Sequence, residues 1–192
     1  MTKLLETIKV VDGNILHVNY HQIRLEHSMK VLNYSTHYDL KSLIVPPKKG
    51  TFRCRVLYSN SSINIEYIPY ETKKISSLKV VTDDNILYDL KYENRNSLNK
   101  LFNLRGNCDD IAIIKNGHLT DSTIANIALF DGEHWYTPNT PLLHGTTRQR
   151  LLDNQTIFTK EIPESTIATY KKSAIFNAMI GFVELEDGII FK

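Results

Sequence analysis

The stretch TFRCRVLYSNSSINIEY, residues 51–67, decides the architecture expected for the first half of the chain. Apolar and polar side chains alternate on both sides of its Asn60-Ser61-Ser62 turn, and the recurring apolar residues are Phe52, Cys54, Val56, Ile63, Ile65 and Tyr67. A period of two residues is typical of strands with one buried face. We therefore expect an antiparallel β-hairpin, around which the rest of this half is arranged.

Outward from this hairpin, the sequence predicts the other elements of a small α+β unit that closes near residue 84. The Asp12-Gly13-Asn14 turn separates the two strands of another hairpin. The double proline Pro46-Pro47 ends the helix before it, because proline has no N–H to donate. The expected elements are strands over 5–11 and 15–18, helices over 21–32 and 38–44, and a strand over 78–81.

The second half of the chain, residues 85–192, is expected to form a separate domain that begins with a helix. Leu98, Leu101 and Phe102 recur there at helical spacing, and Arg105-Gly106-Asn107 marks the end of the helix. Short antiparallel strands follow, and Gly145-Thr146-Thr147 enters another helix. The later expected elements are strands over 111–114, 118–120, 127–130 and 135–136, a helix over 165–180, and a hairpin over 183–191.

The composition is that of a protein with nearly balanced charge. The 192 residues include 23 basic and 21 acidic side chains, a formal net charge of +2, which argues against a general nucleic-acid binder. No apolar run approaches the roughly 20 residues of a membrane span, and the first residues lack a signal-peptide core. Cys54 and Cys108 have no CxxC spacing, so neither a zinc site nor a disulfide framework is predicted. We expect a cytoplasmic protein without a membrane or nucleic-acid partner.

Four features could carry chemistry, and each also has an ordinary structural explanation. Lys91 is expected where a strand passes into a helix, a common place for a surface lysine. Asp121 follows a short strand, where a turn or a helix cap would also explain it. Gly145-Thr146-Thr147-Arg148 could bind an anion at a helix amino terminus or simply cap the helix. Arg24 could belong to a solvent-exposed helix face.

Taken together and in order, six segments resemble the class IV aminotransferase family of pyridoxal-phosphate enzymes. This family includes the branched-chain and D-amino-acid aminotransferases and 4-amino-4-deoxychorismate lyase. The resemblance covers nearly the whole chain. The segments are His21-x-x-Arg24-Leu25-x-x-Ser28, Phe52-Arg53-Cys54-Arg55-Val56, Leu90-Lys91-x-x-Asn94-Arg95, Thr120-Asp121 with Asn126 and Phe130, Thr137-Pro138 with Gly145-x-Thr147-Arg148, and Asn177-Ala178-Met179.

The resemblance implies which residues would bind pyridoxal 5′-phosphate. Lys91 would hold the cofactor as a Schiff base and, once displaced by the substrate amine, would take the substrate's labile proton. Asp121 would face the pyridine nitrogen and keep it protonated. The family usually has Glu at this position, and Asp is one methylene shorter. The residues implied to hold the phosphate are Arg24, Thr146, Thr147, Asn177 and Ala178.

The segments also favour one reaction within the family. The Lys91-x-x-Asn94-Arg95 spacing, the Asn177-Ala178-Met179 segment and the compact length resemble 4-amino-4-deoxychorismate lyase, which eliminates pyruvate to give 4-aminobenzoate for folate biosynthesis. Arg53 and Arg55 share one face of a strand and could bind a substrate carboxylate, or could simply be exposed. The alternatives are a class IV aminotransferase acting on branched-chain or D-amino acids, and a catalytically inactive homologue that binds the cofactor.

Fold and assembly follow from the same resemblance. It implies an α+β protein with the two-domain class IV aminotransferase-like fold. A small N-terminal α+β domain would span residues 1–84, and a C-terminal barrel-like α/β domain over 85–192 would carry the Schiff-base lysine. Family members are usually homodimers, so we expect a homodimer that acts on a small-molecule substrate.

Overall fold

The computed structural model describes residues 2–191 and divides into two compact units. Of the described residues, the first contains 2–72 and Leu90–Asn94, and the second contains Lys73–Asp89 and 95–191. These units differ from the domain ranges expected from the sequence, 1–84 and 85–192, because Lys73–Asp89 belongs to the second unit and Leu90–Asn94, which contains Lys91, belongs to the first. The domain ranges themselves stay a prediction.

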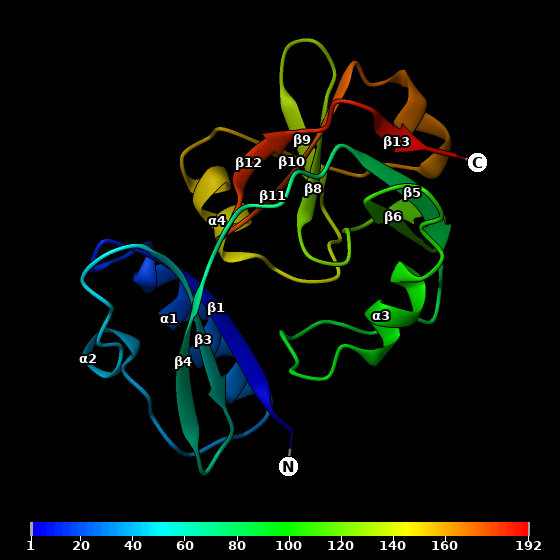
Figure 1. Cartoon of the computed structure of the whole chain (residues 1–192). Coiled ribbons are helices and arrows are strands. Elements are labelled where there is room, and N and C mark those ends of the chain that lie inside the picture. Colours follow the sequence, from blue (N-terminus) through cyan, green and yellow to red (C-terminus); the bar gives the residue numbers. More distant parts are fainter. Residues whose placement is uncertain (1, 192) are drawn as a thin grey trace. The chain divides into compact units, whose positions relative to one another are not determined.

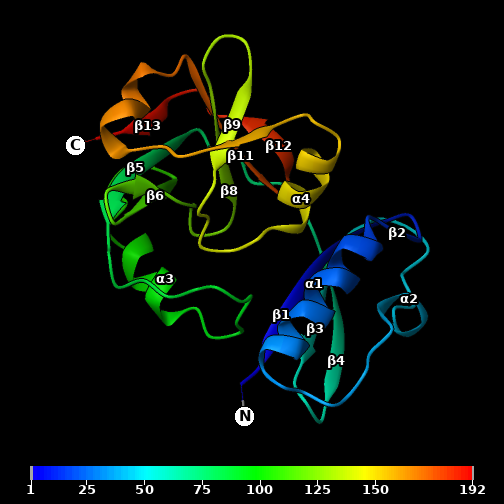
Figure 2. The ribbon, with the colours of Figure 1, turned by 180° about the vertical axis from the view of Figure 1, so that it is seen from behind.

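An antiparallel four-stranded sheet and two helices form the first unit (Figures 1 and 2). The strand order is β2-β1-β3-β4, with β1 at Leu4–Val11, β2 at Asn14–Ile15, β3 at Thr51–Tyr58 and β4 at Ile63–Pro69. The helices are α1 at Val18–Val31 and α2 at Leu40–Leu43. Strands β3 and β4 pair from Phe52 opposite Pro69 to Tyr58 opposite Ile63, which confirms the hairpin predicted from residues 51–67.

Alternate side chains of β1 and β3 build the core of this unit. Leu25 and Met29 lie four residues apart on α1, hence on one helix face, and pack onto these strands. The strand residues of the core include Leu4, Ile8, Val10, Cys54, Val56 and Tyr58. Asp12 and Gly13, which join β1 to β2, have φ of 45° and 81°. Two positive φ values are what a tight two-residue hairpin turn requires, so the Asp-Gly signal in the sequence is confirmed.

Two sheets around a shared core form the second unit. One has the strand order β10-β9-β8-β11-β12 and the other β13-β5-β6-β7, and together they form a half-barrel. Side chains of both sheets are fully buried in one cluster, among them Leu78, Ile114, Ile127 and Ile175. The elements are β5 Ser77–Thr82, α3 Asn96–Phe102, β6 Asp110–Lys115, β7 His118–Leu119, β8 Asn126–Phe130, β9 Trp135–Pro138, α4 Thr146–Asp153, β10 Phe158–Lys160, the 3-10 helix η1 Glu164–Thr169, β11 Lys172–Asn177, β12 Gly181–Glu184 and β13 Gly188–Ile190. The chain is an α+β protein, as expected.

The helix predicted over residues 165–180 is wrong. The structure has the short helix η1 followed by strand β11, which lies between β8 and β12. Four successive residues of β11, Ser173 to Phe176, are buried, so both faces of the strand are covered. A strand covered on both faces loses the period of two that would mark it in the sequence, and its apolar run resembles a buried helix.

The hairpin predicted over residues 183–191 is also wrong. Strand β12 pairs with β11 in one sheet, whereas β13 pairs in parallel with β5 in the other sheet. The predicted turn is present, and Gly188 has a φ of 74°. This turn leads the chain from one sheet to the other. There β13 forms hydrogen bonds with β5, whose edge has no other strand beside it in the part of the chain that the structure describes.

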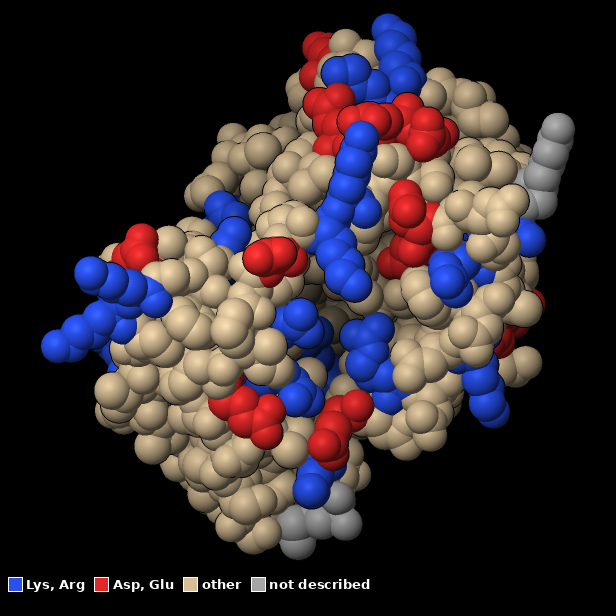
Figure 3. All heavy atoms as spheres, in the orientation of Figure 1, with Lys and Arg blue, Asp and Glu red and all other residues tan. Residues whose placement is uncertain are grey.

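Charge is distributed as the near-neutral composition suggests. Acidic and basic side chains are interspersed over the face of the molecule in Figure 3. Within residues 2–191, no helix has the length and apolar character needed to cross a bilayer.

Candidate functional site

The residues predicted to bind cofactor or substrate form two groups, one in each compact unit. Those of the first unit are Arg24, Arg53, Arg55 and Lys91. Those of the second unit are Asp121, Thr146, Thr147, Asn177 and Ala178. Each group is positioned by its own strands and helices.

A buried carboxylate, Glu6, binds the predicted phosphate-binding residue Arg24. Arg24 reaches from α1 to β1, where its Nε and Nη2 donate to Glu6 Oε1 (2.8 Å) and Oε2 (2.6 Å). His21, one turn earlier on α1, lies with its Nδ1 2.6 Å from Glu6 Oε2. The side chains of Glu6 and His21 are buried, and that of Arg24 is 12% exposed. Two parallel hydrogen bonds fix the plane of the guanidinium as well as its place.

The surroundings of Glu6 keep it ionised. Burial by itself would raise the pKa of this carboxyl, but the charge of Arg24 and the hydrogen bonds from His21 and Arg24 together lower the pKa to about 2. Burial lowers the pKa of His21 and outweighs the opposite effect of Glu6. His21 is therefore a neutral imidazole at pH 7. Its Nδ1–H donates to Glu6, because an ionised carboxylate can only accept.

Glu6 is not among the site residues predicted from the sequence, although the sequence contains a signal for it. Leu4, Ile8 and Val10 form the apolar face of β1, and Glu6 occupies the same face. A charged side chain on a buried strand face requires a partner of opposite charge. The period of two would have singled out Glu6, whereas its partner Arg24 is identified only by the tertiary structure.

Lys91 lies in an extended segment beside β1 and not at the start of a helix. Its carbonyl accepts the N–H of Leu5 (2.9 Å), Tyr92 bridges to Leu4, and α3 begins only at Asn96. The Lys91 side chain is partly buried, and its positive charge contributes to lowering the pKa of His21. The predicted Schiff-base lysine therefore acts electrostatically on the cluster around Glu6.

Arg53 and Arg55 lie on the face of β3 that points away from the core, since Cys54 and Val56 alternate with them and are buried. The guanidinium carbon of Arg53 lies 5.3 Å from the centroid of the Tyr70 ring, and its buried Nε has no hydrogen-bond partner among the described residues. Arg55 donates to Glu66 (2.9 Å). Arg53 therefore keeps a donor for an anionic ligand, whereas Arg55 already has a carboxylate partner. Substrate binding by either stays a prediction.

Asp121 is a buried carboxylate whose hydrogen bonds come from neutral donors. Asn126 Nδ2 donates to its Oδ1 (2.7 Å), and the N–H of Leu143 donates to its Oδ2 (2.9 Å). Burial raises the pKa of Asp121 to about 6, because these hydrogen bonds and the charge of Arg148 offset only part of the desolvation. A cationic partner would lower this pKa. A protonated pyridine nitrogen is such a partner, so Asp121 fits its predicted role.

Thr146 and Thr147 open α4, as predicted. Gly145 is the N-cap residue, and no side chain caps the first turn. Thr146 and Thr147 are buried although both are polar. The first N–H groups of a helix have no intrahelical acceptors, and the helix dipole favours an anion beside them. This donor set suits the phosphate of the expected cofactor.

Asn177 lies at the end of β11 and not within a helix. Its Oδ1 accepts the N–H groups of Met179 (2.8 Å) and Ile180 (3.0 Å), so it caps the turn into β12. Its Nδ2 donates to the carbonyl of Ile124 (3.0 Å). The Asn177 side chain thus joins two turns, and a contribution of Asn177 and Ala178 to phosphate binding stays a prediction.

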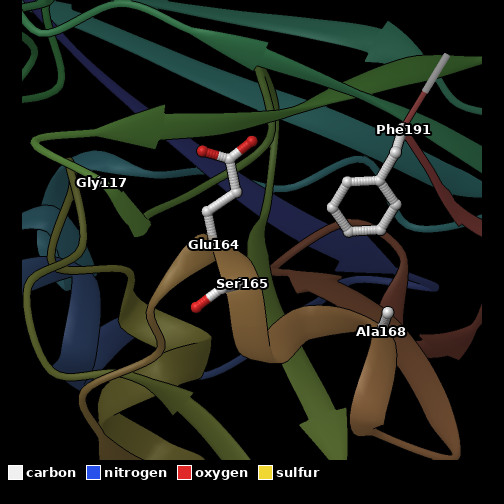
Figure 4. Close-up of a pocket in the computed structure, with 5 residues that line it drawn as sticks. All are labelled: Gly117, Glu164, Ser165, Ala168 and Phe191. Carbon is white, nitrogen blue, oxygen red and sulfur yellow. The ribbon is translucent and has the colours of Figure 1, made fainter.

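A separate open hollow of about 510 Å³ lies beside η1 (Figure 4). It is lined by Gly117, Glu164, Ser165, Ala168 and Phe191. None of the predicted site residues lines it. Among the described lining residues only Glu164 is ionisable, which is too little to fix a ligand such as the expected cofactor.

Comparison with known proteins identifies the family. The family model for amino-transferase class IV matches residues 49–186. The chain belongs to the class IV aminotransferases. An uncharacterized protein of Haemophilus influenzae is 38% identical over 190 residues, which cover 94% of this chain and all of that protein. Class IV aminotransferases are pyridoxal-phosphate enzymes.

Solved structures share the fold of this class IV aminotransferase. One from Haemophilus somnus, named "putative 4-amino-4-deoxychorismate lyase", has a TM-score of 0.88 and 33% identity, covering 94% of this chain and 98% of that chain. A hypothetical aminotransferase from Mycobacterium tuberculosis in its PLP-bound form has a TM-score of 0.79 and 14% identity, covering 98% of this chain and 81% of that chain. The second likeness is one of fold alone.

Proposed function

We propose that this chain is a pyridoxal-phosphate-dependent 4-amino-4-deoxychorismate lyase that releases pyruvate and forms 4-aminobenzoate for folate biosynthesis. The observation that carries the cofactor assignment is Asp121, a buried carboxylate with neutral donors and a pKa of about 6. The choice of the lyase is supported by the 33% identity to the Haemophilus somnus structure over nearly the whole chain.

The resemblance to the family implies which residues would hold the cofactor. Lys91 would bind it covalently through its amine, Asp121 would pair with the ring nitrogen, and Arg24 would pair with the phosphate. The N–H groups and hydroxyls at Thr146 and Thr147, with the Asn177-Ala178 turn, would complete the phosphate site. When bound, pyridoxal phosphate supplies an electron sink for the pair left by proton removal.

Lys91 would act as the proton acceptor of the reaction. A lysine amine accepts a proton only in its neutral form, and positive charge nearby favours that form. Once the substrate amine has displaced it, Lys91 would take the proton from C4 of the substrate. The C3–O bond would then break, the ring would become aromatic, and the released enolpyruvate would gain a proton at its methylene carbon to give pyruvate.

The substrate carries two carboxylates, which arginines can recognise. Arg53, with a buried Nε that has no partner among the described residues, would pair with one of them. Arg55 would either leave Glu66 and pair with the second carboxylate of the substrate, or stay paired with Glu66. In the second case its charge would influence the position of Arg53.

Two alternatives follow from the family. A class IV aminotransferase acting on branched-chain or D-amino acids agrees with the match to the family model as well as the lyase does. A homologue that binds the cofactor without turnover would agree with Asp121 in place of the usual Glu. A cytoplasmic homodimer is the assembly that we propose, and light scattering coupled to gel filtration of the purified protein checks its oligomeric state.

The deciding experiment supplies cofactor-loaded protein with enzymatically prepared 4-amino-4-deoxychorismate. We expect 4-aminobenzoate and pyruvate in equal amounts. Lys91→Ala should abolish the visible absorbance of lysine-bound cofactor and lower the rate by about a thousandfold or more. Lys100→Ala, at an exposed lysine of α3, is the matched control and should stay within about twofold.

The other outcomes separate the alternatives. Absence of aromatic product together with rapid exchange of amino groups between alanine or glutamate and a keto acid would favour the aminotransferase. A loaded protein with neither activity would favour the binding homologue. Visible absorbance that survives in Lys91→Ala would overturn the role of Lys91.

A further inference from the structure

A tight turn places Asp121 and Asn126 opposite one another in the second unit. The two residues form an antiparallel bridge, and the N–H of Ser122 donates to the carbonyl of Ala125 (2.9 Å). The hydroxyl of Ser122 accepts the N–H of Ala125 (3.0 Å), which closes the turn further. Residues paired across a strand bridge project to the same side, so the Asp121 carboxylate and the Asn126 amide meet.

The Asn126 amide joins Asp121 to the loop before α4. Its Nδ2 donates to Asp121 Oδ1 (2.7 Å) and to the carbonyl of Leu143 (2.9 Å), which uses both of its hydrogens. The N–H of Leu143 donates in turn to Asp121 Oδ2 (2.9 Å). Leu143 is therefore held through both of its backbone polar groups. All three residues belong to one closed network, and Asp121 and Asn126 are buried.

Gly145 brings the same loop against Asn126 from its other side. A Cβ at Gly145 would lie 1.9 Å from Asn126 Oδ1, closer than real Cβ atoms approach, and 3.1 Å from its Cγ, which is also a tight contact. The φ of Gly145 is −69°, so the glycine is required for space and not for its backbone conformation. Because Gly145 is the N-cap of α4 and its carbonyl accepts the N–H of Gln149 (3.0 Å), the start of the helix is set directly against Asn126.

We propose that Asn126 is a positioning residue that sets the spacing between Asp121 and the amino terminus of α4. This rests on the proposed function, in which Asp121 pairs with the ring nitrogen and α4 with the phosphate. Those two groups lie at a fixed separation within one cofactor molecule. The protein must hold their partners at a matching separation, and Asn126 contacts both the carboxylate and the loop that begins the helix.

The test compares the affinities for pyridoxal phosphate and for pyridoxal, which lacks the phosphate. The dissociation constant of pyridoxal divided by that of pyridoxal phosphate measures how strongly the phosphate is bound while the ring is in place. Asn126→Ala should reduce this ratio by about tenfold, although Asn126 does not itself contact the phosphate under the proposal. A residue that only stabilises the fold would weaken both ligands alike and leave the ratio unchanged. Isothermal titration of the protein freed of cofactor gives both constants without reference to activity.

Two further variants make the outcome decisive. Thr137→Val removes a buried hydrogen bond to the carbonyl of Ile127 (2.8 Å) in the neighbouring strand and should leave the ratio within about twofold. Gly145→Ala displaces the loop while Asn126 remains, and it should reduce the ratio as Asn126→Ala does. If Asn126→Ala does not fold, Gly145→Ala decides. A folded variant with an unchanged ratio overturns the proposal, whereas a wild-type protein that binds neither ligand overturns the proposed function itself.

Discussion

Glu6 and Asp121 are two buried carboxylates, one in each unit, whose pKa values move in opposite directions. Glu6 lies between the guanidinium of Arg24 and the imidazole of His21, and its pKa falls to about 2. Asp121 receives hydrogen bonds from the neutral groups of Asn126 and Leu143, and its pKa rises to about 6. Burial alone raises both pKa values, so the charge of the partner decides the sign.

The difference separates a completed ion pair from a carboxylate that can still gain a cation. Glu6 already has its cation and serves to fix Arg24. A positively charged ligand beside Asp121 would stabilise the ionised form of this carboxyl, and the carboxylate would stabilise the charge of the ligand to the same extent. This reciprocity is the physical basis for the proposal that the pyridine nitrogen would lie at Asp121.

The largest expected effect is that of Glu6→Ala. Without the carboxylate, the buried groups of Arg24 and His21 lose their acceptor, which should reduce the free energy of unfolding by about 3–5 kcal/mol. Urea unfolding of the protein without cofactor measures this. Glu6→Gln keeps the side-chain volume and one acceptor, so its free energy of unfolding should lie between those of the wild type and Glu6→Ala. A loss below about 1 kcal/mol for Glu6→Ala would show that solvent replaces the carboxylate.

The pH dependence of stability should contain two opposite contributions. The pKa of Glu6 is lowered from 4.5 to about 2, so its contribution is complete above pH 4.5 and is lost as the pH falls towards 2. The pKa of Asp121 is raised from 3.8 to about 6, so its contribution is present below pH 3.8 and is lost as the pH rises through 6. Each should amount to about 3 kcal/mol.

Unfolding of the protein without cofactor at a series of pH values resolves the two contributions. Glu6→Gln should remove the loss of stability on the acidic side only, and Asp121→Asn should remove the decline between about pH 4 and about pH 6 only. Equal changes on both sides in either variant would contradict the separate assignment of the two pKa shifts.

Asp121→Asn should have a smaller effect on stability and a specific effect on the cofactor. At pH 7 its new amide would face two donors, Asn126 Nδ2 and the N–H of Leu143, at a cost of about 1–3 kcal/mol. The ring nitrogen of bound cofactor would lose its acidic partner. Its titration, followed by the absorbance of bound cofactor, should therefore shift to lower pH. Asp121→Glu tests whether the longer side chain preserves this titration, and an unshifted titration in Asp121→Asn would place the ring nitrogen elsewhere.

The smallest expected effect is at an exposed ion pair. Lys172 and Glu184 pair at 2.9 Å across β11 and β12, and each side chain is 53% exposed. Glu184→Gln should change the free energy of unfolding by less than about 1 kcal/mol, because solvent screens the pair. Urea unfolding beside Glu6→Gln gives the comparison. A loss as large as that of Glu6→Gln would mean that burial does not decide the strength of these pairs.

Local patterns in the sequence determined much of the first unit and several candidate residues. The alternation over residues 51–67, the Asp12-Gly13 turn and the start of α4 at Gly145 each depend on a few neighbouring residues, and the structure confirms all three. Lys91 and Asp121 were identified by segments that resemble those of a known family, and comparison with known proteins places the chain in that family.

Only the tertiary structure decided the features that depend on distant partners. Strand β11 is covered on both faces, so its sequence has no period of two, and β13 finds its partner β5 about a hundred residues earlier in the chain. The partners of Glu6 on α1, and the network that joins Asn126 to Gly145, likewise bring together residues far apart in sequence. A sequence pattern shows that a buried carboxylate needs a partner. Which partner it receives, and therefore the direction of its pKa shift, depends on how the chain folds back.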